Sequence, residues 1–226
     1  MKESDIRKRE VFNHYLAMVE KDTKEIFDPQ QFAICNCVAC GSAEHTFAFE
    51  KNGFSYHLCN ECSTLFVTPR PAQSQCKQFY ELSESTEYWI EEFFKPVAEI
   101  RREKIFKPRA AKIATLIQAN NKSDFAIGEI GAGFGLFLEE LKKLCPAVSV
   151  TAIEPSETMA ALCEAKELRV ISAMFEDVQH EPYDMLVCWE LIEHLVDPRN
   201  FFKHVNRALR NDGLFCFSGL NGLGFD

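Results

Sequence analysis

The chain has 226 residues, of which 46% are hydrophobic and 26% charged, and this composition supports one large domain and a small one. Its formal net charge of -9 disfavours a general role on nucleic acid or on an anionic membrane, because those partners are bound by basic surfaces, although a local basic patch is compatible with it. No apolar run approaches the ~20 residues that cross a bilayer, and the N-terminus lacks the apolar core of a signal peptide. We therefore expect a soluble, cytoplasmic protein.

The first predicted element is an amphipathic helix over residues 4–27. Apolar side chains recur there at helical spacing, and charged residues lie between them; they are Phe12, Tyr15, Leu16 and Val19. The helix should end near Asp28-Pro29, so we assign residues 1–34 to it and its exit. This segment carries no recognisable chemistry.

Two Cys-x-x-Cys pairs follow, Cys37 with Cys40 and Cys59 with Cys62, and eighteen residues separate them. Each pair can turn two thiolates inward from a tight turn, so the four together predict a tetrahedral zinc site. A four-cysteine site leaves no open position for water, which favours a structural ion. Cys35 also lies nearby, but its Cys-x-Cys spacing fits the turn less well, and we expect it not to be a ligand.

The residues between the pairs predict a β-hairpin, with strands at 46–50 and 54–58 and a turn at Asn52-Gly53. We therefore expect a zinc ribbon over residues 35–72. Three acids against two strong bases between Cys37 and Arg70 argue against nucleic-acid binding by this ribbon.

Residues 73–122 predict a helical linker or lid after an extended exit over residues 66–71, which contains Pro69-Arg70-Pro71. Its aromatic side chains have two interpretations, packing of a linker helix or a lid over a ligand, and these residues are Phe79, Tyr80, Tyr88 and Trp89. Pro96 and Pro108 interrupt the helical region, which runs to about residue 119. Its basic residues, Arg101, Arg102 and Lys104, should form a solvated face, from which one could reach a cofactor carboxylate.

From residue 123 to residue 226 strands and helices alternate, which predicts a doubly wound, mainly parallel α/β sheet. The expected strands are 125–130, 148–153, 169–172, 185–189 and 214–218. The expected helices are 134–144, 156–166 and 198–209. Ligands of such sheets lie beyond the carboxyl ends of the strands, so the candidate residues should be sought there.

A glycine loop joins the first of these strands to its helix. Gly131, Gly133 and Gly135 have no Cβ, so the backbone can adopt positive φ and lie against a ligand. A dinucleotide fingerprint would need a further glycine at position 136, where Leu136 stands. The spacing here is Gly-x-Gly-x-Gly, preceded by the acid Glu129, and a tight strand-to-helix turn with no ligand is the alternative to a ligand site.

Further candidates follow the next two strands. Glu154 ends the second strand, about twenty residues beyond the loop, where an acid can accept both hydroxyls of a ribose. After the third strand, Phe175 could stack on an adenine ring and Glu176 or Asp177 could accept from its amino group; a capped turn is the equal alternative.

The fourth strand contains Cys188 near its end and is followed by Glu193-His194. A histidine can take a proton near neutral pH and a neighbouring carboxylate can orient it, so this pair is the candidate for catalysis, against a structural pair at a helix start. We assign Cys188 to the cofactor-facing set.

These motifs together resemble bacterial class I S-adenosylmethionine-dependent methyltransferases that carry an N-terminal zinc ribbon, relatives of the sugar-nucleotide C-methyltransferases. The resemblance covers residues 37–226 and rests on the cysteine pairs, Pro69-Arg70-Pro71, the segment 129–135, Glu154-Pro-Ser and Glu193-His-Leu-Val-Asp-Pro. It implies a Rossmann-like domain at 123–226, the cofactors S-adenosylmethionine and Zn2+, and a small-molecule acceptor.

The resemblance also implies roles for the candidates. The three glycines, after Glu129, would hold the amino-acid end of the cofactor, Glu154 the ribose, Phe175 and Glu176 the adenine, and Glu193 with His194 the acceptor. Such domains usually have two more strands after the fifth, so the resemblance also implies a truncated chain or a natural fragment whose last strand is an apolar edge. The rival hypothesis is a non-catalytic module for assembly or cofactor sensing. The oligomeric state stays open.

Overall fold

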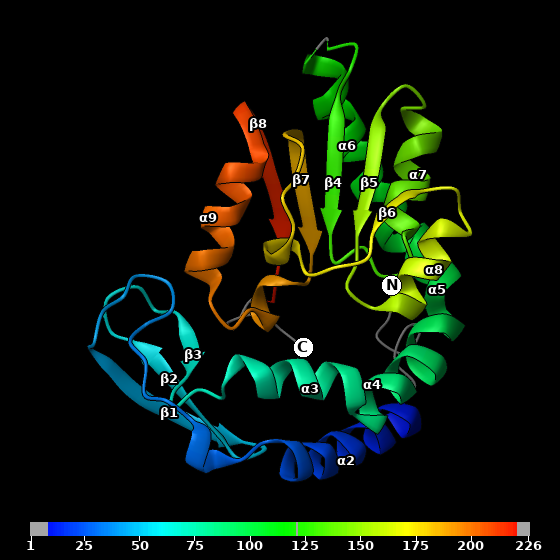
Figure 1. The fold of residues 1–226 in the computed structure, drawn as a ribbon. Coiled ribbons are helices and arrows are strands. Elements are labelled where there is room, and N and C mark those ends of the chain that lie inside the picture. The colour runs from blue at the N-terminus through cyan, green and yellow to red at the C-terminus, as the bar shows by residue number, and fades with distance from the viewer. Residues whose placement is uncertain (1–8, 121, 221–226) are drawn as a thin grey trace. The chain divides into compact units, whose positions relative to one another are not determined.

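A parallel five-stranded sheet organises the C-terminal half of the chain (Figure 1). The computed structural model describes residues 9–120 and 122–220. The strands of this sheet are β4 (Ala126–Ile130), β5 (Ser149–Ile153), β6 (Arg169–Ile171), β7 (Tyr183–Trp189) and β8 (Leu209–Ser218). Their order is β6-β5-β4-β7-β8, and all four neighbouring pairs are parallel. The predicted doubly wound sheet is confirmed.

Helices cover both faces of this sheet because the central strands are apolar on both sides. The helices are α6 (Lys107–Asn120), α7 (Leu136–Leu144), α8 (Glu157–Glu164) and α9 (Pro198–Ala208). On β7, Met185 and Val187 belong to the core under α6 and α7, whereas the alternate residues Leu186 and Cys188 belong to the core under α9. This alternation follows from the two-residue period of a strand.

The last strand begins earlier than predicted. Tyr183 pairs with Leu209 but Met185 pairs with Leu214, so residues 210–213 bulge out of the ladder. Asp212 has a φ of 63°, and a Cβ on Gly213 would lie 2.9 Å from the carbonyl oxygen of Arg210. The predicted helix 198–209 therefore ends one residue short, and a tight turn inside β8 separates Leu209 from the apolar segment.

The chain divides into two compact units, Met1–Ala98 with Val196–Arg199, and Glu99–Leu195 with Asn200–Asp226. The predicted linker 73–122 is thus divided after Ala98 between the two units. The first unit contains α2 (Arg9–Ile26), η1 (Pro29–Gln31), α3 (Gln73–Leu82), α4 (Glu84–Tyr88), the π-helical η2 (Trp89–Phe94) and η3 (Lys95–Val97). Of the predicted N-terminal helix, residues 4–8 lie outside the described part of the chain.

The ribbon in this unit is an antiparallel sheet of β1 (His45–Lys51), β2 (Phe54–Cys59) and β3 (Leu65–Val67). Asn52 and Gly53 have φ values of 52° and 79° at its tip, which is the type I′ geometry that an Asn-Gly pair favours. The hairpin prediction is confirmed. The sequence predicted an extended exit near Phe66 but not its pairing with β2.

The aromatic residues of the linker pack within the first unit. The Trp89 ring lies 3.9 Å from the Phe93 ring, centroid to centroid, in a stacked arrangement, and 4.5 Å from that of Tyr15 in α2. Phe79 contacts Phe27 at the end of α2. These contacts bring α2 together with the segment that follows the ribbon.

In the second unit, α5 (Ala98–Arg101, the first residue of which belongs to the other unit) and the π-helical η4 (Arg102–Phe106) precede α6. Arg102 forms ion pairs with Glu139 and Glu140 of α7, and its side chain is 12% exposed. The expectation that Arg102 belongs to a solvated face was therefore wrong, because two carboxylates of the following helix draw it onto the protein.

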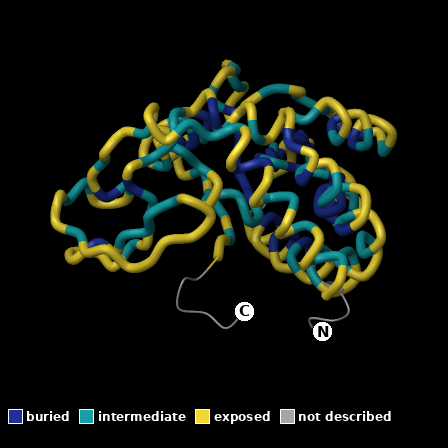
Figure 2. The backbone as a smooth tube through the Cα atoms, turned by 90° about the horizontal axis from the view of Figure 1, so that it is seen from below, coloured by how far each residue is buried: buried dark blue, intermediate teal, exposed yellow. Residues whose placement is uncertain are grey.

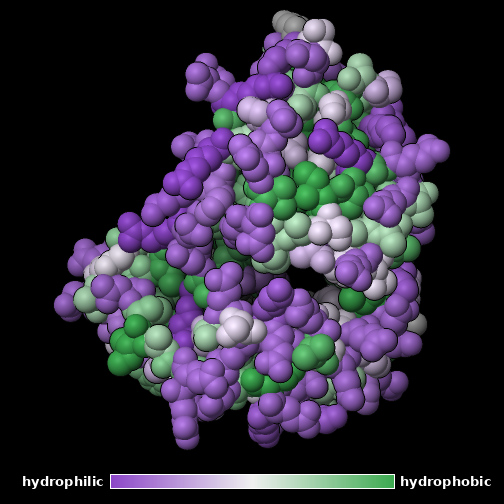
Figure 3. Space-filling view, viewed as in Figure 1, coloured by the Kyte–Doolittle hydropathy of each residue, from purple (hydrophilic) through white to green (hydrophobic). Residues whose placement is uncertain are grey.

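Buried residues are concentrated in the unit with the five-stranded sheet, whereas the ribbon is mostly half-buried or exposed (Figure 2). Hydrophilic residues dominate the visible face of each unit, as the high charge content leads one to expect (Figure 3). Among the described helices, none is sufficiently long and apolar to span a bilayer.

Candidate functional site

The four cysteines of the ribbon converge. The Sγ atoms of Cys37, Cys40, Cys59 and Cys62 all lie within 4.8 Å of one another, and the Cys37–Cys62 and Cys40–Cys59 pairs are 3.6 Å apart. A tetrahedral Zn2+ with Zn–S bonds of about 2.3 Å requires sulfur separations of roughly 3.8 Å. The arrangement fits that ion without rearrangement of the backbone.

The two cysteine turns have matching backbone conformations. The amide of Gly41 donates to the carbonyl of Cys37, and that of Ser63 donates to the carbonyl of Cys59. Both residues have positive φ, 84° for Gly41 and 58° for Ser63. Sequence reasoning pointed to the cysteines but not to Ser63, which occupies the position of the glycine in the second turn.

The sulfur environments differ. Hydrogen bonds from the hydroxyl and the backbone of Thr64 lower the pKa of Cys62 to about 6, which favours the thiolate that zinc requires. Cys35 stands outside the cluster, and its thiol donates to the carbonyl of Val67 at 3.7 Å. The fully buried hydrophobic residues described in the ribbon are only Cys37, Cys59 and Phe66. A core this small needs additional stabilisation, such as that from a bound metal ion.

In the second unit, the glycine loop lies at the carboxyl end of β4. Gly131, Gly133 and Gly135 have φ values of 69°, 54° and 68°. The Gly131 amide donates to the carbonyl of Ile153 at 2.8 Å, which turns the chain across the end of β5.

The three glycines have different surroundings. A Cβ on Gly135 would lie 2.7 Å from Leu168 Cδ1 and 2.9 Å from Cys163 Sγ, whereas a Cβ on Gly133 would meet nothing within 4 Å. Gly135 is therefore needed for close packing of α7, and Gly133 faces open space in which a ligand can approach the backbone.

Glu154 connects this loop to the next strand end. It is buried, and its Oε2 accepts from the Gly133 amide at 2.8 Å while its Oε1 accepts from the Ser156 amide at 3.0 Å. Burial raises the pKa of Glu154, and the two backbone hydrogen bonds oppose that rise. Glu154, the residue predicted to bind the ribose, is thus in direct contact with the glycine loop.

Glu129 lies in β4 directly before the loop and is 2% exposed. Its Oε2 has no hydrogen-bond partner among the described residues. Burial raises the pKa of Glu129 well above the ordinary range, the charge of Glu154 adds to this, and Arg109 opposes it. A buried carboxyl oxygen without a partner is costly, and its position at the strand end suits a donor group supplied by a ligand.

A second cluster at the strand ends was not found from the sequence. Arg109 Nη2 of α6 donates to Glu190 Oε1 at 2.9 Å, and Ser218 Oγ donates to the same oxygen at 2.7 Å. The guanidinium carbon of Arg109 lies 4.9 Å from the ring centroid of Trp189. Glu190 has a φ of 53°, a conformation that a non-glycine residue keeps only where its surroundings hold it. Its position directly after a predicted strand was the available signal.

Two predicted cofactor residues are instead in the core. Phe175, in η5 (Phe175–Asp177), is 3% exposed and stacks on His180 at 4.5 Å while also contacting Phe201. Its ring therefore offers no free face to an adenine in this conformation. Cys188 is fully buried under α9, and burial raises the pKa of its thiol to about 12. The strand-end positions of both residues place their side chains inward. Glu176 stays half-buried beside them.

Residues 128–217 match the model of a family described as a methyltransferase domain. This segment is therefore similar to methyltransferase domains. It contains the glycine loop, Glu154 and the Glu193-His194 pair.

Two curated enzymes resemble part of this chain. Malonyl-[acyl-carrier protein] O-methyltransferase of Bacillus anthracis is 30% identical over 102 residues, which are 42% of this chain and 38% of that protein. Ubiquinone biosynthesis O-methyltransferase of Colwellia psychrerythraea is 26% identical over 140 residues, 57% of this chain and 56% of that protein. The chain thus spans less than two thirds of the length of each of these relatives.

A solved structure is similar in fold to part of this chain. The plantazolicin methyltransferase BpumL, in complex with a pentazolic desmethylPZN analog and SAH, aligns with a TM-score of 0.54 at 16% identity, over 66% of this chain and 62% of that chain. At this identity the similarity shows the fold alone.

Glu193 and His194 lie in η6 (Ile192–His194), just beyond β7. Both residues are exposed, yet neighbouring protein atoms desolvate the imidazole and lower the pKa of His194, against the effect of Glu193 and then Glu190. A lowered pKa keeps the imidazole neutral near pH 7, which is the form that can accept a proton.

Proposed function

We propose that this protein is an S-adenosylmethionine-dependent methyltransferase that acts on a small molecule. The observation that carries the proposal is the glycine loop in the segment that matches the methyltransferase family. Gly133 of this loop faces open space, and Glu129, just before the loop, has a carboxyl oxygen without a hydrogen-bond partner among the described residues. The curated relatives support it, since both bear the name of O-methyltransferases.

The residues present fit this cofactor. The ammonium group of its amino-acid end can supply the donor that Glu129 Oε2 lacks, and the left-handed loop allows close approach of the backbone. Glu154 is buried at the end of β5 and each of its oxygens retains a lone pair for a ribose hydroxyl. With Phe175 in the core, we leave the adenine contact to residues other than this ring.

The cofactor supplies an electrophilic methyl group on a sulfonium sulfur, so the chain has to position the acceptor and exclude water. We propose that His194 accepts the proton that the attacking carbon or hydroxyl of the acceptor loses. Glu193 would then hold the resulting imidazolium, a role that suits the carboxylate next to it in the chain. The acceptor class that we propose is a sugar nucleotide or another precursor of a polysaccharide or secondary metabolite.

We further propose that Cys37, Cys40, Cys59 and Cys62 hold a structural Zn2+. The sulfur separations support this, and the small apolar core of the ribbon gives the ion a structural purpose. Four thiolates fill a tetrahedral ion, so the zinc takes no part in the methyl transfer.

Calorimetry with S-adenosylmethionine and, separately, with NAD tests the cofactor assignment. We expect saturable binding of the first only, weakened in Glu154→Gln and unchanged in Glu157→Gln, an exposed acid three residues further on. Binding of NAD would overturn the cofactor class, and binding of neither would favour the non-catalytic module. Mass spectrometry of candidate acceptors incubated with the protein and the cofactor then separates an enzyme from a cofactor sensor. Only an enzyme converts the acceptor into a product that is about 14 Da heavier.

A further inference from the structure

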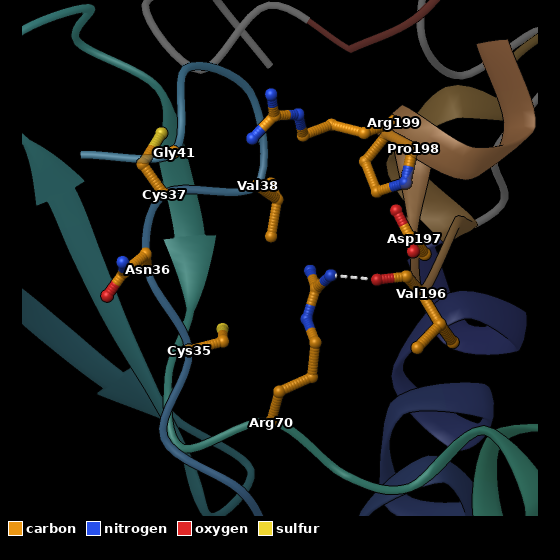
Figure 4. Close-up of a pocket in the computed structure, with 10 residues that line it drawn as sticks. All are labelled: Cys35, Asn36, Cys37, Val38, Gly41, Arg70, Val196, Asp197, Pro198 and Arg199. Atoms are coloured by element: carbon orange, nitrogen blue, oxygen red, sulfur yellow. Dashed lines mark hydrogen bonds between the residues drawn. The ribbon is translucent and has the colours of Figure 1, made fainter. Parts of the chain in front are cut away.

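A cavity of about 340 Å3 lies in the first unit beside the cysteine turn (Figure 4). Its walls are the segment from Cys35 to Gly41, Arg70, and the four residues 196–199 that belong to this unit. The proposed methyl transfer uses none of these walls. The size is in the range of pockets that hold small ligands.

Arg70 enters the cavity from a fixed piece of backbone. Its amide donates to the carbonyl of Ala33 at 2.8 Å, and the amide of Ala33 donates back to its carbonyl at 2.9 Å. Pro69 and Pro71 flank it and restrict φ on both sides. The guanidinium donates from Nη1 to the carbonyl of Val196, which leaves its other N–H groups for a further acceptor (Figure 4).

Arg199 reaches the same cavity from the first turn of α9. Its Nη1 lies 2.7 Å from the place where a Cβ of Gly41 would stand, so the absence of a side chain at position 41 makes room for the guanidinium. The two guanidinium groups point toward the space beside Val38 from different elements (Figure 4). Two forks that converge on one cavity are suited to an oxyanion, which each can bind through paired N–H groups.

Negative charge also surrounds the cavity. Asp197 is among its lining residues, and the thiolate of Cys37 would be near, although its sulfur is not directed between the two guanidinium groups (Figure 4). The negative charges of Asp197 and the Cys37 thiolate repel an anion, so one arginine alone would bind it weakly. Both arginines are therefore required for binding.

We infer that this cavity binds a phosphate or diphosphate group through Arg70 and Arg199. The site gives an acidic chain of net charge -9 a local point of attraction for an anion.

Calorimetry of the full zinc-loaded chain with inorganic phosphate, pyrophosphate and UDP, at constant ionic strength, tests the site. We expect saturable binding that weakens about 10-fold or more in Arg70→Gln and in Arg199→Gln, because each loses a charge-assisted contact. Arg207→Gln, which removes the same charge from an exposed position of α9 outside the cavity, should bind as the wild type does. Zinc content and S-adenosylmethionine affinity, measured on every variant, show whether the two folds are intact.

The outcomes separate the anion site from the methyltransferase function. Binding of UDP tighter than that of pyrophosphate would assign the anion to a nucleotide, and equal binding would assign it to the diphosphate alone; both support the site. Absence of saturable binding by wild-type protein that retains zinc, or equal losses in the Arg207 variant, would overturn it. Failure to bind S-adenosylmethionine would overturn the proposed function and leave the anion result standing.

Discussion

Alanine at Gly133 and alanine at Gly135 should have opposite principal effects, although the two positions are two residues apart in the same loop. Both have left-handed backbones, with φ of 54° and 68°, so each alanine should cost about 1–2 kcal/mol in conformation alone. At Gly135 the added methyl would also meet Leu168 and Cys163 at 2.7 and 2.9 Å, and overpacking of that kind adds about 1–3 kcal/mol. The free energy of unfolding should therefore fall by about 1–2 kcal/mol for Gly133→Ala and by about 2–5 kcal/mol for Gly135→Ala.

Cofactor affinity should follow the other order. The methyl group of Gly133→Ala would project into open space, where we place the ligand, so S-adenosylmethionine should bind about 10-fold or more weakly. Folded Gly135→Ala has its methyl group directed into the protein between α7 and α8 and should keep most of its affinity.

Urea unfolding followed by circular dichroism gives the stabilities, and calorimetry below the unfolding transition gives the affinities. At about 2–4 °C per kcal/mol for a chain of this size, the melting temperature should fall by roughly 2–8 °C and 4–20 °C, respectively. Gly133→Ala that binds the cofactor like wild type would refute the placement of the ligand. Equal stability losses at both positions would refute the packing argument.

Three further outcomes are expected. Chelation of the zinc, or Cys40→Ser, should unfold the ribbon, since such sites contribute ~10–16 kcal/mol in isolated peptides, whereas Cys76→Ser should retain the metal; amide exchange of β1 and β2 that stays slow after chelation would contradict this. Burial raises the folded-state pKa of Glu129, so the folded protein binds the extra proton and stability should fall as pH rises from the ordinary carboxyl pKa through that raised value; Glu129→Gln should lose this fall in urea titrations, and parallel curves would argue against it. His194→Ala should keep cofactor affinity and lose about 10²–10⁴-fold in turnover once an acceptor is found, and unchanged turnover would remove His194 from the reaction.

The sheet was predictable because its strands are buried on both faces and therefore read as short apolar runs separated by helical periods. The ribbon was predictable for a different reason, since Asn52-Gly53 and the paired cysteines require particular backbone geometries. The bulge at 210–213 was not, because the apolar pattern of β8 resumes only at Leu214.

The candidate site was predictable only where the backbone itself is part of the signal. Gly131, Gly133 and Glu154 were found through the loop and its spacing. Arg109 was missed because several basic residues precede the sheet and only tertiary packing decides which of them reaches Glu190. The burial of Phe175 was not predictable because a residue after a strand can point into the core or out of it, and a short 3-10 turn here directs the ring inward.

The hydrogen bonds of Glu154 have a consequence for how the cofactor site is assembled. Its carboxylate is fixed by backbone amides of Gly133 and Ser156, which belong to the loops after two different strands. Fixing a glutamate side chain costs up to about 1.5–2 kcal/mol of rotamer entropy, and here that cost falls on folding instead of on binding. If Glu154 binds the cofactor as proposed, cofactor affinity depends on the order of both loops. A substitution that loosens either amide should then weaken binding without contacting the ligand.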